Sequence, residues 1–231
     1  MSKNIYAVIP ARGGSKGIPK KNLKLFNKKP LLFYAAKAAK ESKCFKKIIL
    51  STDNKEIAEY GKEIGLEVPY LRDKTLSTDK SKTIDLVYDL IQKCNLKGSI
   101  CLIQATSPLV DKRDFINACE MHLRTNKTIL SVSEYLFNQS IICTLNKDLT
   151  LKFLKKNKGI PRQDIPKTYK LNGCFFLNKI THIIRSKTLA PNGSLPYIMP
   201  KYSSVDIDDY VDWELAQFIQ SNLKVFKDKT S

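Results

Sequence analysis

A segment rich in glycine and lysine, residues 11–22 (ARGGSKGIPKKN), is the part of the sequence best suited to chemistry. Its three glycines let the backbone turn tightly, and successive N–H groups in such a loop can form an anion-binding nest. Its basic residues are Arg12, Lys16, Lys20 and Lys21. Together they could neutralise a triphosphate or a pyrophosphate. The alternative is a solvated connector. The segment lacks both the G-x-x-x-x-G-K-[ST] and the G-x-G-x-x-G pattern, so neither a Walker-type NTPase nor a nicotinamide dehydrogenase is indicated.

A pair of carboxylates near the other end of the chain, Asp206 and Asp208, is a candidate metal site. In an extended segment the two side chains point to the same side, because strand side chains alternate. Mg²⁺ accepts a few carboxylates together with water and phosphate oxygens. The alternative is that Asp208 or Asp209 caps the helix predicted to follow. A polyphosphate loop favours the metal interpretation, since polyphosphate chemistry generally uses a divalent ion.

Other polar candidates are weaker taken singly. Gln104 ends an apolar segment, where a substrate contact or an idle amide is expected equally. Arg72 and Ser81 could contact a nucleotide base, and Arg162 could clamp a carboxylate by a bidentate bond or lie solvated. No G-x-S-x-G elbow or Cys/His pair points to covalent catalysis.

Short apolar runs alternate with amphipathic stretches and must position these residues. Strands are predicted at residues 5–10, 47–51, 99–103, 128–132, 171–177 and 197–199. Helices are predicted at residues 31–39, after Asp53-Asn54, and at 83–94, 113–123, 180–185 and 210–221. This alternation predicts an α/β fold with a mostly parallel sheet and helices on both faces. Ligands bind beyond the carboxyl ends of such strands, where the candidate residues lie.

The pattern changes between about residues 138 and 170. This stretch is basic, punctuated by prolines and only weakly alternating, which indicates an inserted β-rich arm and not a crossover helix. We therefore divide the chain into an α/β core, residues 1–137 plus 171–231, and an inserted arm, residues 138–170.

The charge of the chain is concentrated near its beginning. The 231 residues carry a formal net charge of +18, of which the first forty, with nine Lys, one Arg and no acidic residue, contribute +10. A local excess favours a local anion. A basic nucleic-acid-binding protein is the non-enzyme alternative, but residues 11–25 hold no aromatic side chain for base stacking.

Composition also limits the class of protein. A hydrophobic fraction of 42% is too high for a disordered chain. No segment has the roughly 18 consecutive apolar residues of a membrane span, and the first residues do not resemble a signal peptide. The six cysteines form no C-x-x-C pair and are predicted to be reduced core thiols. These observations predict a cytoplasmic globular protein without a membrane partner.

Four motifs in order, IPARGGSKGIPKKN, LIQATSPL, RQDIPKTYKLNG and SVDIDDYVDWELA, resemble those of the acylneuraminate cytidylyltransferases, including the legionaminic and pseudaminic acid enzymes. The resemblance implies a Rossmann-like α/β fold with an inserted dimerisation arm, and a homodimer. It implies that CTP and a nonulosonic (sialic-type) acid give a CMP-sugar and pyrophosphate with Mg²⁺. The anomeric hydroxyl would attack the α-phosphate in line.

The resemblance also implies roles for individual residues. The catalytic group is Arg12, Lys21, Asp206 and Asp208, and the last two would hold Mg²⁺. The nucleotide-binding group is Ala11, Arg12, Gly13, Ser15, Lys16, Lys21, Asn22, Arg72 and Ser81. The sugar-binding group is Gln104, Arg162 and Phe176.

The sequence departs from the family pattern at three positions. Ala105 replaces a proline and Val110 an arginine of the Q-P-T-S-P-L-R motif, and Phe176 stands where many relatives carry tyrosine. Val110 and Phe176 concern the sugar side, so sialic, legionaminic and pseudaminic acids remain alternatives. A related enzyme for another sugar or nucleotide, or a glycosyltransferase using the Asp206-x-Asp208 pair, are further alternatives.

Overall fold

A computed structural model describes residues 4–135, 142–154 and 166–230. Its central sheet has six strands in the order β10-β6-β9-β5-β1-β4. Their bounds are β1 (Ile5–Pro10), β4 (Lys47–Ser51), β5 (Ser99–Ile103), β6 (Ile129–Tyr135), β9 (Thr168–Lys179) and β10 (Leu195–Ile198). The shorter elements are β2 (Leu25–Phe26), β3 (Lys29–Pro30), β7 (Cys143–Leu145), β8 (Leu151–Phe153) and the 3₁₀ helices η1 (Lys74–Leu76) and η4 (Lys201–Ser203).

The sheet is mixed, with one strand reversed. β1 pairs in parallel with β4 and β5, and β10 pairs in parallel with β6. β9 is antiparallel to both of its neighbours, β5 and β6. Its first residue pairs with the last residue of β6 (Tyr135 with Thr168), so the insertion leaves the sheet on β6 and returns on β9. Antiparallel neighbours need no crossover helix, which allows an arm of this kind.

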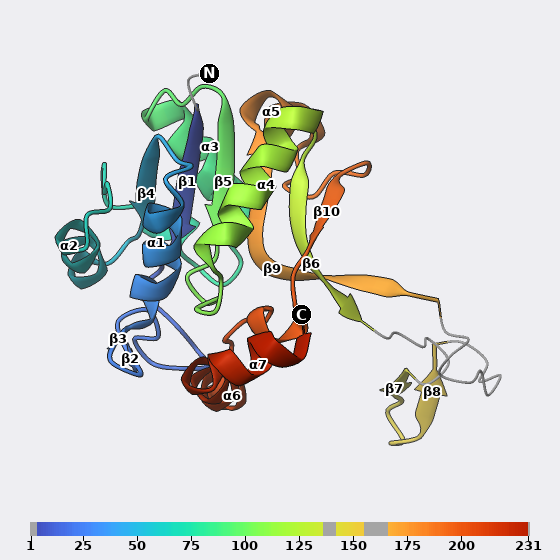
Figure 1. The fold of residues 1–231 in the computed structure, drawn as a ribbon. Coiled ribbons are helices and arrows are strands. Elements are labelled where there is room, and N and C mark those ends of the chain that lie inside the picture. Colours follow the sequence, from blue (N-terminus) through green and yellow to red (C-terminus); the bar gives the residue numbers. More distant parts are fainter. Residues whose placement is uncertain (1–3, 136–141, 155–165, 231) are drawn as a thin grey trace.

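Helices cover both faces of this sheet (Figure 1). Their bounds are α1 (Leu31–Ser42), α2 (Lys55–Glu63), α3 (Thr83–Lys93), α4 (Lys112–Thr125), α5 (Ile180–Ser186), α6 (Tyr210–Ser221) and α7 (Leu223–Thr230). Along β1, Ala7 and Ile9 face a core shared with α1 and α4, whereas Tyr6 and Val8 face a core shared with α3 and α5. The strand alternation therefore confirms the predicted sheet buried on both sides.

A third core cluster lies at the carboxyl ends of the strands and fixes the region of the candidate site. It joins Ile18 of the first loop, Ile207 of the acidic segment and Trp213 of α6. The Trp213 and Phe26 rings meet edge to face, with centroids 5.3 Å apart. Packing of this cluster brings the two ends of the sequence together, since Ile18 and Ile207 are otherwise distant along the chain.

The described part of the insertion is a two-stranded antiparallel hairpin, β7 with β8, and Figure 1 shows it apart from the body. The β-rich character expected of the arm is confirmed for these residues. Residues 168–170, predicted to be part of the arm, belong to β9 of the sheet. Within the described residues, no helix has the length and apolarity needed to cross a membrane.

Candidate active site

A cavity of about 370 Å³ opens at the carboxyl ends of β1 and β5. The predicted residues that line it are Arg12, Ser15, Lys21, Asn22, Arg72, Ser81, Gln104, Asp206 and Asp208. They come from five separate parts of the chain. The topology therefore brings most of the predicted site to one place.

The first loop is fixed to the strand ends by its backbone. The Ala11 N–H donates to the Ser51 carbonyl at 2.9 Å, and the Gly13 N–H donates to Asp53 Oδ1 at the same distance. Ala11 is buried in the core and does not line the cavity, so its contribution to the site is to hold the loop. A side chain at Gly13 would meet Asn54 at 2.8 Å, so glycine is required for this close approach.

The second half of the loop packs against the acidic segment. A Cβ at Gly17 would lie 2.1 Å from the Asp208 carbonyl oxygen, so the two backbones touch here. Lys21 crosses the same contact: its Nζ donates to the Ile207 carbonyl and lies 3.7 Å from Asp208 Oδ1. The Lys21 side chain is only 11% exposed. This cation is therefore held between the loop and the carboxylates.

Asp206, Asp208 and Asp209 have different surroundings. Asp209 caps α6, because its Oδ1 accepts from the backbone N–H groups of Val211 and Asp212. Asp208 is free of that task, and its side chain is 83% exposed at the cavity. Asp206 Oδ1 is buried without a hydrogen-bond partner. Capping, the alternative to a metal role, is thus carried by the third carboxylate of the run.

The acidic pair fits a divalent cation. Burial raises the pKa of Asp206 above its usual range, and Asp208 adds to this rise, whereas Thr106 and Lys21 oppose it. A buried carboxylate oxygen without a partner is costly unless something positive or a donor meets it. Within the described ranges no group of three or more His, Cys, Asp or Glu side chains could hold a metal. Water and phosphate oxygens would therefore complete the coordination, as Mg²⁺ prefers.

Arg72 brings a second unsatisfied group to the cavity. Its side chain is buried, its Nε donates to Ser77 Oγ at 2.9 Å, and its Nη1 is buried without a partner. Burial lowers the pKa of Arg72, Asp53 opposes this, and Arg12 lowers it further. An arginine remains protonated nonetheless. Arg72 therefore presents a charged donor that a ligand could satisfy.

Two further residues line the cavity, Asp79 and Thr106, which no sequence motif marked as candidates. Asp79 Oδ1 lies 2.7 Å from Arg12 Nη1, and its Oδ2 lies 2.6 Å from Lys16 Nζ. The Thr106 carbonyl accepts from the Ile207 N–H at 2.9 Å, which ties the turn after β5 to the acidic segment. The position of Thr106, two residues after Gln104, was a usable signal. A lone aspartate in a Lys-rich loop was not.

The three predicted sugar residues are placed differently. Gln104 lines the cavity, and its backbone N–H donates to the Cys174 carbonyl at 2.9 Å. Phe176 does not line it: this half-buried ring packs in the core shared with α3 and α5. Val110 is buried in the opposite core, also away from the cavity. Arg162 lies outside the described residues.

A family model described as cytidylyltransferase matches residues 6–187. The chain belongs to the cytidylyltransferase family. A CMP-N,N'-diacetyllegionaminic acid synthase of Legionella pneumophila is 36% identical over 92% of this chain and 94% of its own length. A pseudaminic acid cytidylyltransferase of Campylobacter jejuni is 30% identical over 94% and 96%. An N-acylneuraminate cytidylyltransferase of Escherichia coli is 34% identical over 95% of this chain, which spans 53% of that longer protein.

Solved structures confirm the fold of this cytidylyltransferase. A CMP:2-keto-3-deoxy-manno-octonic acid synthetase complexed with CTP has a TM-score of 0.68, at 14% identity, over 94% of this chain and 98% of its own. A 4-diphosphocytidyl-2C-methyl-D-erythritol synthase from Anaerococcus prevotii has a TM-score of 0.63, also at 14% identity and over 94% and 98%. The Rossmann-like fold, the family resemblance and the nucleotidyltransferase class predicted from the sequence are thus confirmed.

Proposed function

We propose that this cytidylyltransferase couples CTP to a sialic-type nonulosonic acid, releasing pyrophosphate and a CMP-sugar. One observation carries the proposal: a single cavity is lined by two basic side chains, Arg12 and Lys21, and by two carboxylates, Asp206 and Asp208. The relatives named for CMP-legionaminic, pseudaminic and N-acylneuraminic acid chemistry support the substrate class.

In this reaction the anomeric hydroxyl oxygen of the sugar acid attacks the α-phosphorus of CTP in line. A new P–O bond forms, the bond from the α-phosphorus to the oxygen shared with the β-phosphate breaks, and pyrophosphate leaves with that electron pair. The hydroxyl gives up its proton to solvent water. The protein has no covalent step to perform, so its contributions are positioning and charge neutralisation.

The first loop would bind the triphosphate. Arg12 and Lys16 offer guanidinium and ammonium donors to the outer phosphates, and Ser15 offers a hydroxyl at the cavity wall. Lys21, held by the Ile207 carbonyl, sits at the junction with the acidic segment. There it would neutralise negative charge as it develops between the α-phosphorus and the leaving group.

Asp206 and Asp208 would hold Mg²⁺, as the unpartnered Asp206 oxygen and the exposed Asp208 carboxylate permit. The bound ion would supply charge neutralisation for the phosphate oxygens.

The nucleoside would lie against the part of the cavity lined by Arg72 and Ser81. The unpartnered Nη1 of Arg72 is the donor most in need of an acceptor, and a pyrimidine carbonyl is one such group. Ser81 lines the same wall, although its hydroxyl already donates to the Thr75 carbonyl at 2.7 Å. Asn22 donates to the Arg12 carbonyl at 3.0 Å, so we give it a supporting role for the loop.

The sugar acid would enter beside Gln104, with Arg162 of the arm as a second contact. As a test, Gln104→Ala should raise the KM for the acid about tenfold and leave the KM for CTP within about twofold, because one hydrogen bond to substrate is lost. Phe176→Leu is the matched control, since that ring packs in the core, and it should change neither KM. Arg162→Ala should also raise the KM for the acid more than the KM for CTP. Equal effects on both KM values would contradict the assignment.

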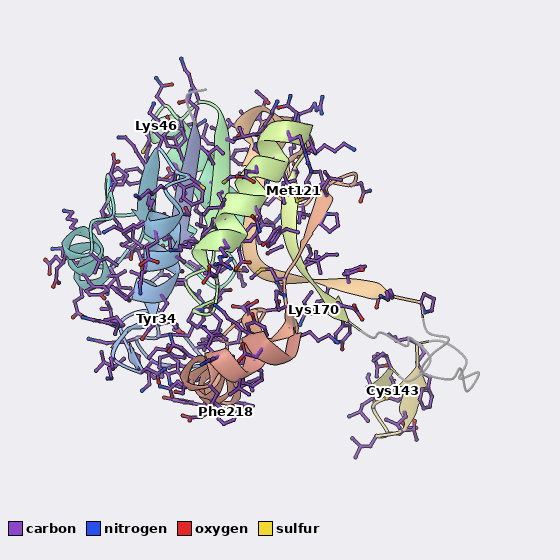
Figure 2. All side chains as sticks on the ribbon, in the orientation of Figure 1. Tyr34, Lys46, Met121, Cys143, Lys170 and Phe218 are labelled. Carbon is purple, nitrogen blue, oxygen red and sulfur yellow. The ribbon has the colours of Figure 1, made fainter. Side chains whose placement is uncertain are left out.

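A homodimer through the arm is part of the proposal. The hairpin exposes the large apolar side chains Leu145, Leu149, Leu151, Phe153 and Leu154. An isolated two-stranded hairpin is only marginally stable in water, so we expect this apolar surface to pack against a second protein surface. The body offers an apolar groove of about 720 Å³, lined in part by Ile198, Leu215 and Phe218. Figure 2 labels Cys143 on the hairpin and Phe218 on α6, which mark the two surfaces.

Light scattering tests the dimer directly. Phe153→Glu should give the mass of a monomer, and Lys152→Glu, on the neighbouring exposed position of β8, should leave the dimer intact. A dimer that survives Phe153→Glu would contradict the arm assignment.

The decisive assay for the activity measures pyrophosphate release with Mg²⁺, each of four nucleoside triphosphates, and a panel of sialic, legionaminic, pseudaminic and octulosonic acids. We expect release with CTP and one of the nonulosonic acids. Release only with octulosonic acid or another nucleotide would select the related-enzyme alternative, and no release with CTP and any of these acids would overturn the proposal. A cytoplasmic location stays a prediction, with which the lack of a disulfide among the six cysteines, all of them in the described residues, agrees.

A further inference from the structure

Asp79 occupies an unusual position for an acidic residue, among the cations of the proposed triphosphate site. It belongs to the loop between η1 and α3 and lines the same cavity as Arg12 and Lys21. Its two carboxylate oxygens pair with two different cations, Arg12 at 2.7 Å and Lys16 at 2.6 Å. A phosphate group would be bound in the same way, with one anionic oxygen on a guanidinium and another on an ammonium.

The electrostatics explain why a carboxylate is stable here. Arg12 lies near Arg72, and the repulsion between them helps to lower the pKa of Arg72. Hydrogen bonds from Lys16 and Arg12 hold the pKa of Asp79 below its usual range, so it is ionised at neutral pH. The carboxylate thus balances a cluster of cations that would otherwise repel one another.

CTP bound in this cavity would compete for the same contacts. Arg12 and Asp79 line the cavity of about 370 Å³, and the several negative charges of a triphosphate there would draw Arg12 and the neighbouring Lys16 away from Asp79. The Lys16 and Asp79 side chains are 82% and 44% exposed, so their pair is weak and easily exchanged. A triphosphate carries more negative charge than one carboxylate, so it would displace Asp79 from the two cations.

We propose that Asp79 is an internal stand-in for a phosphate group, which CTP must displace and which returns to Arg12 and Lys16 when pyrophosphate leaves. Asp79 is therefore a specificity-determining residue: it competes with every ligand, and only a ligand that reaches both cations displaces it. The affinity for CMP, which has no β- or γ-phosphate, would not increase when Asp79 is displaced.

The experiment rests on the proposed function and measures equilibrium binding of CTP, inorganic pyrophosphate and CMP to the full chain, with Mg²⁺ and without the sugar acid. Asp79→Asn keeps the shape and removes the charge. It should tighten the binding of CTP and of pyrophosphate roughly three- to tenfold, as expected when a competitor held by two exposed ion pairs is lost. The affinity for CMP should not change.

Glu56→Gln is the matched control. It removes the same charge from a pair with the same loop, 3.0 Å from Lys20 Nζ, and neither residue lines the cavity. Its affinities should equal those of the wild type. Circular dichroism before and after heating checks that both variants are folded.

Each outcome decides the inference. Equal CTP affinities in the wild type and in Asp79→Asn would overturn the stand-in role and leave the proposed function intact. Weaker binding by Asp79→Asn would mean that Asp79 assists the phosphates, which also overturns it. A wild-type chain that binds neither CTP nor pyrophosphate would overturn the proposed function and the inference with it.

Discussion

The two walls of the cavity carry the same kinds of charge in opposite environments. On the inner wall, Lys21 is 11% exposed and Asp206 has a buried oxygen without a partner. On the outer wall, Asp79 pairs with Lys16, which does not itself line the cavity, and the two side chains are 44% and 82% exposed. The inner charges are fixed by the packing around them, whereas the outer charges satisfy one another.

This difference indicates a division of labour. Charges fixed in a desolvated position act strongly and need no rearrangement during the reaction, which suits transition-state stabilisation. Charges on the surface interact weakly and exchange partners readily, which suits capture and release of a polyanion. We therefore expect the inner wall to control kcat and the outer wall to control the KM for CTP.

The largest expected effect separates two adjacent carboxylates. Asp208→Asn should lower kcat by at least about 100-fold, the order of effect seen when a charge-stabilising group is removed from an active site. Asp209→Asn should leave kcat nearly unchanged, because asparagine caps a helix as well as aspartate does. Pyrophosphate release across a Mg²⁺ titration, with both substrates saturating, measures this.

Asp209→Ala completes that comparison. Loss of the cap should cost about 1 kcal/mol of stability without a matching loss of kcat. Normal Mg²⁺-dependent turnover in Asp208→Asn would mean that the acidic pair holds no metal.

A smaller effect should separate two lysines of the same loop. Lys21→Met should lower kcat about thirtyfold with a modest change in KM, since its ammonium acts in a desolvated position. Lys16→Met should raise the KM for CTP about three- to fivefold and leave kcat alone, because a solvated contact contributes little. Steady-state kinetics with CTP varied at saturating acid measures both. If both variants lowered kcat, or both raised only the KM for CTP, the proposed difference between the two walls would be contradicted.

Periodicity and turn residues were enough to predict most of the fold. The buried strands and α1, α3, α4 and α6 were predicted within a few residues, and Asn54 caps α2 as expected, accepting from the Ile57 N–H at 3.0 Å. The direction of β9 could not be read, because an apolar strand has the same pattern in either direction. α7 was missed: Ser221 and Asn222 indicate a helix end, and a second helix begins directly after them.

The site was predictable where local chemistry is distinctive. Glycines with basic residues after a strand, and carboxylates spaced by two, both indicated groups that line one cavity. What the sequence alone could not reveal was exposure and pairing. Nothing in it distinguished the buried Lys21 from the exposed Lys16, or showed that Asp79 reaches the first loop from a distant segment.

The smallest expected effect concerns stability. Asp206→Asn should raise Tm by about 2–4 °C at pH 7.5 in EDTA, because it removes a desolvated charge whose Oδ1 is buried without a hydrogen-bond partner. The reason lies in the pKa of Asp206, which burial raises above the ordinary value of 3.8 in the folded chain. A raised folded pKa means that the protonated form stabilises the fold. That stability is full below pH 3.8 and is lost as the pH rises through the folded pKa.

The advantage of Asp206→Asn should therefore shrink as the pH is lowered from 7.5 toward 4, where the wild-type carboxyl takes up its proton. Asp208→Asn is the matched control, since that side chain is 83% exposed and its charge is already solvated. It removes only the repulsion that Asp208 exerts on Asp206, so its Tm gain at pH 7.5 should be smaller than that of Asp206→Asn. A Tm for Asp206→Asn at or below that of the wild type at pH 7.5 would show that Asp206 is satisfied in the folded chain. The Asp206 carboxylate would then have no unfavourable desolvation energy for a bound cation to offset.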